Sequence, residues 1–222
     1  MSWWSWQMTK PVGVVRFLGT NCDQDIWKAI EKVGLTPKWL WYEDRFVHSE
    51  YSAVIIPGGF SYGDYLRSGA LASRSPVMDS VREFAEKGYP VMGICNGFQI
   101  LCEAKLLPGA LVKNESLKFI DKWVQLKQHG LCEAFGQKWD KVRLPIAHGD
   151  GRYFISEEQL KILKDNDQIW LTYQKNPNGS VMDIAGVMNV RKNVAGMMPH
   201  PERAMASWMG GSDGLAFFET IM

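Results

Sequence analysis

The chain lacks the features that mark several broad classes of protein. Its 222 residues carry 25 basic and 24 acidic side chains, so no charge excess favours nucleic acid or an anionic membrane surface. No apolar run approaches the length of about 20 residues that spans a bilayer, and no GxxxxGK[ST] phosphate loop occurs. The four cysteines show no CxxC spacing, so they suggest neither a zinc knuckle nor a disulfide framework. These absences favour a cytoplasmic protein that acts on small molecules or binds protein partners.

An apolar run does occur, and it ends in a glycine-flanked cysteine, Cys95. Gly93 and Gly97 stand two residues before and two after it, as in a nucleophile elbow, where a strand turns sharply into a helix and larger side chains would collide. A helix predicted over 96–104 would direct its free N–H groups and positive dipole end at the sulfur and favour the thiolate. The alternative is a buried structural cysteine, which is what most free cysteines are.

Apolar segments alternate with helical patterns through the first half of the chain, which predicts an α/β fold with a doubly wound, mostly parallel sheet. After Pro108 the segments become shorter and predict a smaller antiparallel decoration. We expect a single domain over 11–222, preceded by a Trp-rich N-terminal extension over 1–10. Either these first residues form an interfacial tail, or Met8 is the true start. The predicted strands lie at 12–17, 38–41, 53–56, 91–94, 122–128, 141–146 and 169–174, and the predicted helices at 22–33, 76–87, 96–104 and 157–164.

A catalytic cysteine usually needs a histidine and a group that orients it. His200 is followed by Pro201 and Glu202, and a proline biases the preceding residue towards an extended conformation, in which residues two apart share a side. Glu202 can then reach the imidazole, although a surface turn with a chance ion pair is the alternative. His148 lies in a glycine-rich turn that serves either a partner interface or the turn itself. Cys22 lies at a predicted helix N-terminus and needs no chemistry there.

These motifs together resemble the class I glutamine amidotransferases, whose elbow and late His-Pro-Glu segment read GICNGFQ over 93–99 and HPE over 200–202 here. Longer strings are similar to the glutaminase subunits of phosphoribosylformylglycinamidine synthase. The resemblance runs from about Val12 to the end of the chain and implies a flavodoxin-like fold, with Leu18, where the family often has proline, as one departure. The strings are FLGTNCD (17–23), PGGFSYGDYLR (57–67), AHGDGR (147–152), NPNGS (176–180) and MPHPER (198–203).

The resemblance also implies an activity. Cys95 would attack the side-chain amide of glutamine, form a glutamyl thioester and release ammonia. His200 would shuttle the proton, and Glu202 would hold the imidazole in the useful tautomer. The backbone N–H groups near Gly59 and at Asn96 would donate hydrogen bonds to the oxyanion. Gln99 would contact the substrate.

A partner chain is implied because this chain carries no phosphate loop. The resemblance implies a synthetase subunit that uses ATP and magnesium to convert formylglycinamide ribonucleotide to formylglycinamidine ribonucleotide in purine biosynthesis. It also implies a small accessory subunit that bridges the two. No cofactor or metal is expected in this chain itself.

Two other interpretations stay open at this stage. A cysteine hydrolase or peptidase of the same elbow fold would share Cys95 and His200 but would act without glutamine, so glutamate release distinguishes the two enzymes. A non-catalytic regulatory subunit would retain the fold alone. Trapping of Cys95 by a glutamine-like electrophile distinguishes that interpretation.

Overall fold

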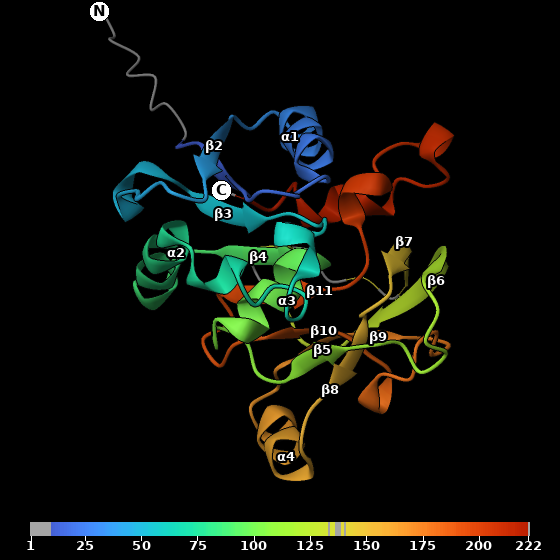
Figure 1. Ribbon diagram of the computed structural model, residues 1–222. Helices are drawn as coiled ribbons and strands as arrows, with labels where there is room; N and C mark the ends of the chain where they lie inside the picture. Colours follow the sequence, from blue (N-terminus) through green and yellow to red (C-terminus); the bar gives the residue numbers. More distant parts are fainter. Residues whose placement is uncertain (1–9, 133, 136–138, 140, 222) are drawn as a thin grey trace, which may run out of the picture.

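The computed structural model describes residues 10–132, 134, 135, 139 and 141–221 (Figure 1). The Trp-rich residues 1–8 and the proposed start at Met8 therefore lie outside the described residues. The helices are α1 (Asp23–Lys32), α2 (Pro76–Glu86), α3 (Asn96–Glu103) and α4 (Glu157–Asp165). The strands are β1 (Val12–Arg16), β2 (Pro37–Trp41), β3 (Ala53–Ile56), β4 (Val91–Ile94), β5 (Ala110–Val112), β6 (Ile120–Gln128), β7 (Val142–His148), β8 (Arg152–Phe154), β9 (Ile169–Tyr173), β10 (Ile184–Met188) and β11 (Val194–Met197).

Within the described residues, nine strands form one mixed sheet in the order β2-β1-β3-β4-β11-β10-β9-β6-β7. The neighbours from β2 to β11 run parallel, and the remaining neighbours pair antiparallel. Strands β5 and β8 form a separate two-stranded sheet. The predicted α/β fold is confirmed, and most of the antiparallel strands extend the main sheet itself.

The strands follow from their burial patterns. All residues of β3 and β4 are buried, as expected for strands covered on both faces, and their sequences are almost continuously apolar. Strand β7 instead alternates between buried and more exposed positions, as expected for a strand with one covered face. Helix α1 buries Ile26, Ala29 and Ile30, and it packs on β1 and β2.

Most predicted elements occur within one or two residues of their expected ends, but the sequence reading missed four strands. Strands β5 and β8 are three residues long, too short to give a periodic signal. Strands β10 and β11 contain Gly186 and Gly196, and glycine weakens a strand pattern. A Cβ atom on Gly186 would lie 2.7 Å from the carbonyl oxygen of Gly196, so these glycines allow close pairing. None of the described helices has the length and apolar character needed to cross a membrane.

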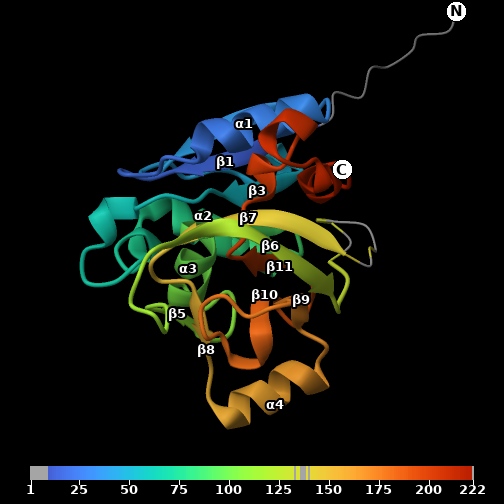
Figure 2. The same cartoon turned by 90° about the vertical axis from the view of Figure 1, so that its right-hand side faces the viewer.

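The sheet curls so that its last strand returns to the middle. Strand β7 lies four strand spacings from β11, which corresponds to about 19 Å in a flat sheet. Yet the N–H of His200, three residues after β11, donates a hydrogen bond of 2.9 Å to the carbonyl of Pro145 in β7. Figure 2 shows β7 and β6 arching over β11, with α4 at the opposite end of the molecule from α1.

The strand directions bring several loops to one edge. Strands β1, β3, β4 and β11 are mutually parallel, so their carboxyl ends share this edge. Four successive antiparallel pairings lead from β11 through β10, β9 and β6 to β7, so β7 runs in the same direction as β11. The carboxyl end of β7 is His148, which therefore lies at the same edge. Sites in open α/β sheets form beyond such carboxyl ends.

The close contact between Gly97 of α3 and Ile56 of β3 predicts how a substitution there changes the free energy of unfolding. A Cβ atom on Gly97 would overlap the backbone carbonyl oxygen of Ile56, and neither backbone can move freely. Gly97→Ala should therefore lower the free energy of unfolding by about 3 kcal/mol or more, despite alanine's better helix propensity. Urea unfolding measures this change. Gly149→Ala is the control, because its Cβ would meet Phe119 at 3.9 Å, and a loss as large there would contradict the steric explanation.

Candidate functional site

Cys95 sits in a strained turn between β4 and α3. Its φ is 51° and its ψ is −105°, a conformation that is uncommon for a residue with a side chain. A Cβ atom on Gly93 would lie 2.5 Å from the carbonyl oxygen of Gly97, and Gly97 itself is pressed against Ile56. The predicted elbow and the steric need for both glycines are confirmed.

His200 and Glu202 form a buried hydrogen-bonded pair. Nδ1 of His200 lies 2.6 Å from Oε1 of Glu202, and the two residues are 2% and 1% exposed. The pairing was expected, but the extended chain that led to it is wrong beyond His200. His200 itself is extended, whereas Pro201–Arg203 forms a 3-10 turn. This turn, with proline at its first position, brings Glu202 back to the imidazole.

The surroundings of His200 fix where its protons lie. Burial by itself lowers the pKa of His200, but the charges of Glu202 and Cys95 outweigh it and raise that pKa well above its ordinary value. Because Oε1 of Glu202 is an acceptor, Nδ1 is the donor of the 2.6 Å bond. Nε2 has no hydrogen-bond partner in the described part of the chain and is left to exchange a proton with a neighbour.

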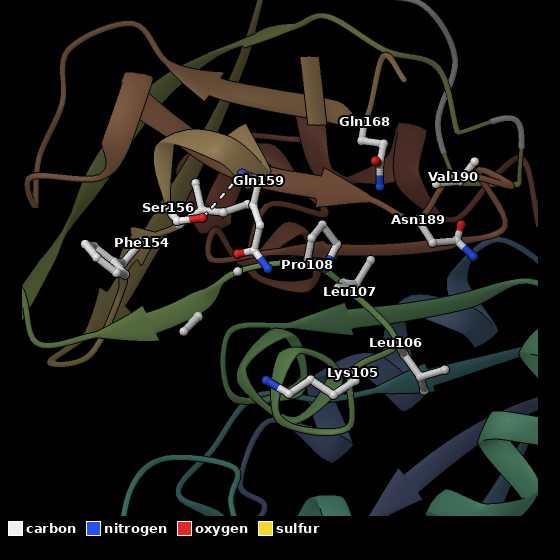
Figure 3. Close-up of a pocket in the computed structure, with 13 residues that line it drawn as sticks. Lys105, Leu106, Leu107, Pro108, Phe154, Ser156, Gln159, Gln168, Asn189 and Val190 are labelled. Atoms are coloured by element: carbon white, nitrogen blue, oxygen red, sulfur yellow. Dashed lines mark hydrogen bonds between the residues drawn. The ribbon is translucent and has the colours of Figure 1, made fainter. Parts of the chain in front are cut away.

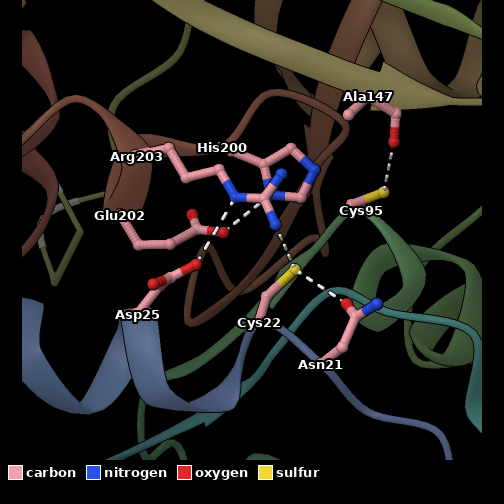
Figure 4. A network of polar contacts seen from close by, with 8 residues as sticks. All are labelled: Asn21, Cys22, Asp25, Cys95, Ala147, His200, Glu202 and Arg203. Carbon is pink, nitrogen blue, oxygen red and sulfur yellow. Dashed lines mark hydrogen bonds and ion pairs between the residues drawn. The ribbon is translucent and has the colours of Figure 1, made fainter. Parts of the chain in front are cut away.

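One cavity of about 330 Å³ contains both the thiol and the imidazole. A Cβ atom on Gly58 would lie 2.9 Å from Cε1 of His200, 3.1 Å from Sγ of Cys22 and 3.4 Å from Cβ of Cys95, so this glycine lets the three side chains approach. Figure 4 shows Cys95 on one side of the His200 ring and Glu202 on the other. The lining residues are Asn21, Cys22, Gly59, Phe60, Asp64, Ser68, Cys95, Gln99, Phe119, Ala147, His148, Gly149, Asp150, His200 and Arg203.

Cys22 belongs to this cavity, which the sequence reading did not foresee. It stands immediately before α1, as predicted, but its side chain does not cap the helix. Its Sγ lies 3.2 Å from Nη2 of Arg203 and 3.3 Å from Oδ1 of Asn21 (Figure 4). Arg203 also pairs with Asp25 at 3.5 Å, so this network links α1 to the turn that carries His200.

His148 is the other residue whose place the sequence left open. It is 3% exposed, and its Nδ1 lies 3.0 Å from Oδ1 of Asn114. Burial, and then the charge of His200, lower the pKa of His148 to about 4. The ring is therefore neutral at pH 7, with its Nε2 unpartnered. Its position at the end of β7, opposite the end of β4, was hidden from the sequence because only the curled sheet brings these ends together.

The other predicted site residues lie around the elbow. Gly59 lines the cavity with φ +143°, and a Cβ there would lie 2.7 Å from the backbone nitrogen of Asn21. Asn96 uses its side chain to accept from the N–H of Ser61 at 3.1 Å and to donate to Oε1 of Gln99 at 2.8 Å. Gln99 lines the cavity and donates from Nε2 to the carbonyl of Asp150 at 2.7 Å.

One group of side chains has the composition of a metal site. Donor atoms of Cys22, His200 and Glu202 lie within 4.8 Å of one another, and thiolate, imidazole and carboxylate are all zinc ligands. The guanidinium of Arg203, 3.2 Å from the sulfur, already places a positive charge there and opposes a metal ion. His200 and Glu202 are already hydrogen-bonded to each other, and Cys22 is bonded to Arg203 and Asn21.

A larger cavity lies away from this chemistry. It has a volume of about 550 Å³ and is lined by residues that include Lys105, Phe154, Gln168 and Val190 (Figure 3). None of its described lining residues is a cysteine, histidine or carboxylate. The smaller cavity, which joins a cysteine in a strained elbow to a histidine, is therefore the candidate site.

Comparison with known proteins agrees with this geometry. Residues 9–212 match the family of CobB/CobQ-like glutamine amidotransferase domains. A chain of PurLQS from Thermotoga maritima is similar at 44% sequence identity with a TM-score of 0.88, over 96% of this chain and 98% of that one. A glutamine amidotransferase from the same organism shares the fold at 21% identity and a TM-score of 0.56, over 90% of this chain and 81% of that one.

The lowered pKa of His148 predicts a pH dependence of stability. The unfolded chain binds a proton at about pH 6.5, whereas the folded ring does so only near pH 4. Stability is therefore full above pH 6.5 and is lost as pH falls towards 4. Between pH 7 and pH 5, His148 should contribute a loss of about 2 kcal/mol.

Denaturant unfolding of the wild type and of His148→Gln at both pH values measures this contribution. Glutamine can still donate to Oδ1 of Asn114 but does not titrate, so the variant should lose about 2 kcal/mol less on acidification. Equal losses in the two proteins would show that His148 is not the group responsible.

Proposed function

The chain belongs to the CobB/CobQ-like glutamine amidotransferase family, and from this premise we propose that it is the glutaminase subunit of phosphoribosylformylglycinamidine synthase. It would hydrolyse glutamine to glutamate and pass the ammonia to a synthetase. The observation that carries the proposal is that one cavity joins the strained Cys95 elbow to the buried His200–Glu202 pair. The 44% identity to a chain of PurLQS over almost the whole length supports the choice of subunit.

The proposed reaction starts with the thiol of Cys95. The proton of this thiol passes to Nε2 of His200, whose raised pKa favours the charged ring, and Sγ attacks the side-chain carbonyl carbon of glutamine as a thiolate. The 2.6 Å bond to Glu202 fixes Nδ1 as the protonated nitrogen and stabilises the imidazolium that forms. His200 then returns the proton to the leaving nitrogen, so ammonia departs and a glutamyl thioester remains. Water, activated by the same imidazole, releases glutamate.

The tetrahedral intermediate needs donors for its negative oxygen. We assign the backbone N–H groups of Gly59 and Asn96, neither of which donates a hydrogen bond within the described part of the chain. Asn96 opens α3, so its N–H also lies at the positive end of a helix. A donor of this kind contributes about 3 kcal/mol to the transition state in related chemistry.

Gln99 is assigned to substrate contact, with part of its amide already in use. Its Oε1 accepts from Asn96 and its Nε2 donates to the carbonyl of Asp150. Each group keeps one further hydrogen-bonding position. The network therefore holds the amide rigidly at the wall of the cavity one turn after Cys95.

The partner of this chain is a synthetase subunit that uses ATP and magnesium, with a small accessory subunit, in the cytoplasm. The relative is named as PurLQS, which supports an assembly of several subunits. Ammonia is mostly protonated and non-nucleophilic at neutral pH, so delivery within a complex suits the chemistry. This chain itself would need no cofactor.

Replacement of the nucleophile tests the proposal. Cys95→Ala should abolish glutamine-dependent synthesis by the assembled complex, whereas added ammonium should still support it. Both rates can be measured as product formation in the same preparation. Cys102→Ala is the control, because Cys102 is buried and does not line the cavity. Loss of both activities in an intact Cys95→Ala complex would contradict the glutaminase role.

Replacement of the orienting carboxylate tests the proposed proton transfers. Glu202→Gln keeps the shape of the side chain but removes the charge that stabilises the imidazolium and fixes its tautomer. Glutaminase kcat should fall by about 10³-fold or more, while ammonium-dependent synthesis stays near the wild-type rate. A kcat within a factor of about three of the wild type would rule out the orienting role.

A further inference from the structure

A second, smaller cavity reaches the catalytic pair from the other side. It lies between α1 and the turns that follow His200, has a volume of about 180 Å³, and is called the rear cavity below. Glu202 lines the rear cavity but not the described part of the cavity that holds Cys95. In Figure 4, Glu202 and Asp25, which both line the rear cavity, lie on the side of His200 away from Cys95.

One oxygen of Glu202 is left without a partner beside this cavity. The residue is almost completely buried, and its Oε1 is taken up by Nδ1 of His200 at 2.6 Å. Its Oε2 is also buried but has no hydrogen-bond partner among the described atoms. Buried polar atoms are normally hydrogen-bonded, so this oxygen calls for a donor. Because Glu202 lines the rear cavity, an occupant of that cavity can supply the donor.

The rear cavity also carries positive charge that the chain does not neutralise. Lys28 and Lys32 are exposed and stand four residues apart on α1, so their side chains share one face of the helix. Neither lysine forms an ion pair with any residue that the structure describes. Asp25 is already paired with Arg203 at 3.5 Å. The outer part of the cavity therefore offers two cations to an anionic group.

The remaining described lining is apolar. Ala29 and Met205 are buried, Met209 is partly buried, and Trp208 is 83% exposed at the rim. The volume equals that of about six water molecules, which is too small for a nucleotide but suits a molecule of the size of an amino acid. A ligand seated here would cover apolar surface that now faces solvent.

We propose that the rear cavity binds an apolar α-amino acid. Its ammonium would donate to Oε2 of Glu202, and its carboxylate would meet Lys28 and Lys32. Its side chain would pack against Met205 and Trp208. Each part of such a molecule thus answers one observation, namely the unsatisfied acceptor, the unpaired cations and the apolar lining. A fatty acid would leave the acceptor unsatisfied, and an alkylamine would leave the two lysines without an anion.

An amino acid bound there would act on the catalytic pair. Burial lowers the pKa of His200, and the charge of Glu202 is the largest influence that raises it. An ammonium at Oε2 would offset part of that charge, so His200 would hold the proton of Cys95 less firmly. The ligand would therefore inhibit the enzyme without competing with glutamine. This inhibition rests on the proposed glutaminase function, whereas the binding does not.

Binding is tested with L-norleucine as the probe, on the full-length chain assembled with its synthetase. Cys95 is first trapped with the diazoketone 6-diazo-5-oxo-L-norleucine, which fills the catalytic cavity and prevents the probe from binding there as a glutamine analogue. Equilibrium dialysis of radiolabelled norleucine then measures Kd. Hexanoate, which lacks the amine, should not displace the probe.

Two double variants locate the site. Lys28→Met with Lys32→Met should raise the Kd of norleucine about 10-fold or more, the effect of losing one hydrogen bond to a charged group. Lys161→Met with Lys164→Met is the matched control and should keep the wild-type Kd. These lysines are also exposed and unpaired within the described chain, but they lie on α4, at the opposite end of the molecule from α1 (Figure 2). Without norleucine, both variants should synthesise product at the wild-type rate, which shows that they are folded.

Inhibition is measured on the untrapped complex at saturating glutamine. Norleucine should lower glutamine-dependent synthesis about 5-fold or more, and further glutamine should not restore the rate. Ammonium-dependent synthesis should not change, because it bypasses His200. The variant of Lys28 and Lys32 should need about 10 times more norleucine for the same inhibition.

The outcomes separate the two proposals. No binding to the trapped complex, equal Kd values in the two double variants, or displacement by hexanoate would overturn the rear-cavity site. Inhibition that further glutamine reverses would overturn its action through Glu202. A wild-type complex whose Cys95 does not react with the diazoketone would count against the glutaminase function instead, and norleucine binding to the untreated chain would still decide the rear-cavity site.

Discussion

Glu202 is 1% exposed, and one oxygen of its carboxylate, Oε1, is hydrogen-bonded to the buried imidazole of His200 at 2.6 Å. Isolated charges of this kind cost several kcal/mol to bury, so each member of the pair requires the other. The pair fixes the tautomer of His200 and raises its pKa against the opposing effect of burial. The turn Pro201–Arg203, the network of Cys22 and the packing around Gly58 are arranged about this pair. A site built in this way has a defined proton distribution before a substrate arrives.

The sheet supplies the second constraint, because the site draws residues from both of its halves. The parallel strands place the elbow and His200 at one edge of the sheet. His148, in contrast, ends β7, which is the last strand in the sheet order. The hydrogen bond from His200 to Pro145 closes this distance. Sγ of Cys95 then lies 3.8 Å from the carbonyl of Ala147, the residue before His148. The curl of the sheet therefore completes the cavity wall.

How far the sequence predicted this structure depends on the range of the interactions involved. The elbow was predictable because its steric constraints fall within five residues, from Gly93 to Gly97. The His200–Glu202 contact was also local, although the turn that produces it differs from the extended chain expected. The places of Cys22 and His148 were not predictable, since they depend on contacts across the sheet. No periodic pattern marks a side chain whose partner lies 30 to 180 residues away.

His148 and His200 show how such distant partners decide chemistry. Both rings are buried in one cavity, and burial alone lowers the pKa of both. His200 faces a carboxylate, whose charge raises its pKa, whereas His148 meets only the neutral amide of Asn114, so burial and the charge of His200 lower its pKa to about 4. At neutral pH one ring can therefore carry a proton while the other remains an acceptor. If both were charged, their repulsion would lower the pKa of the base beside Cys95. The choice of Asn114 over a carboxylate thus keeps the two halves of the cavity chemically distinct.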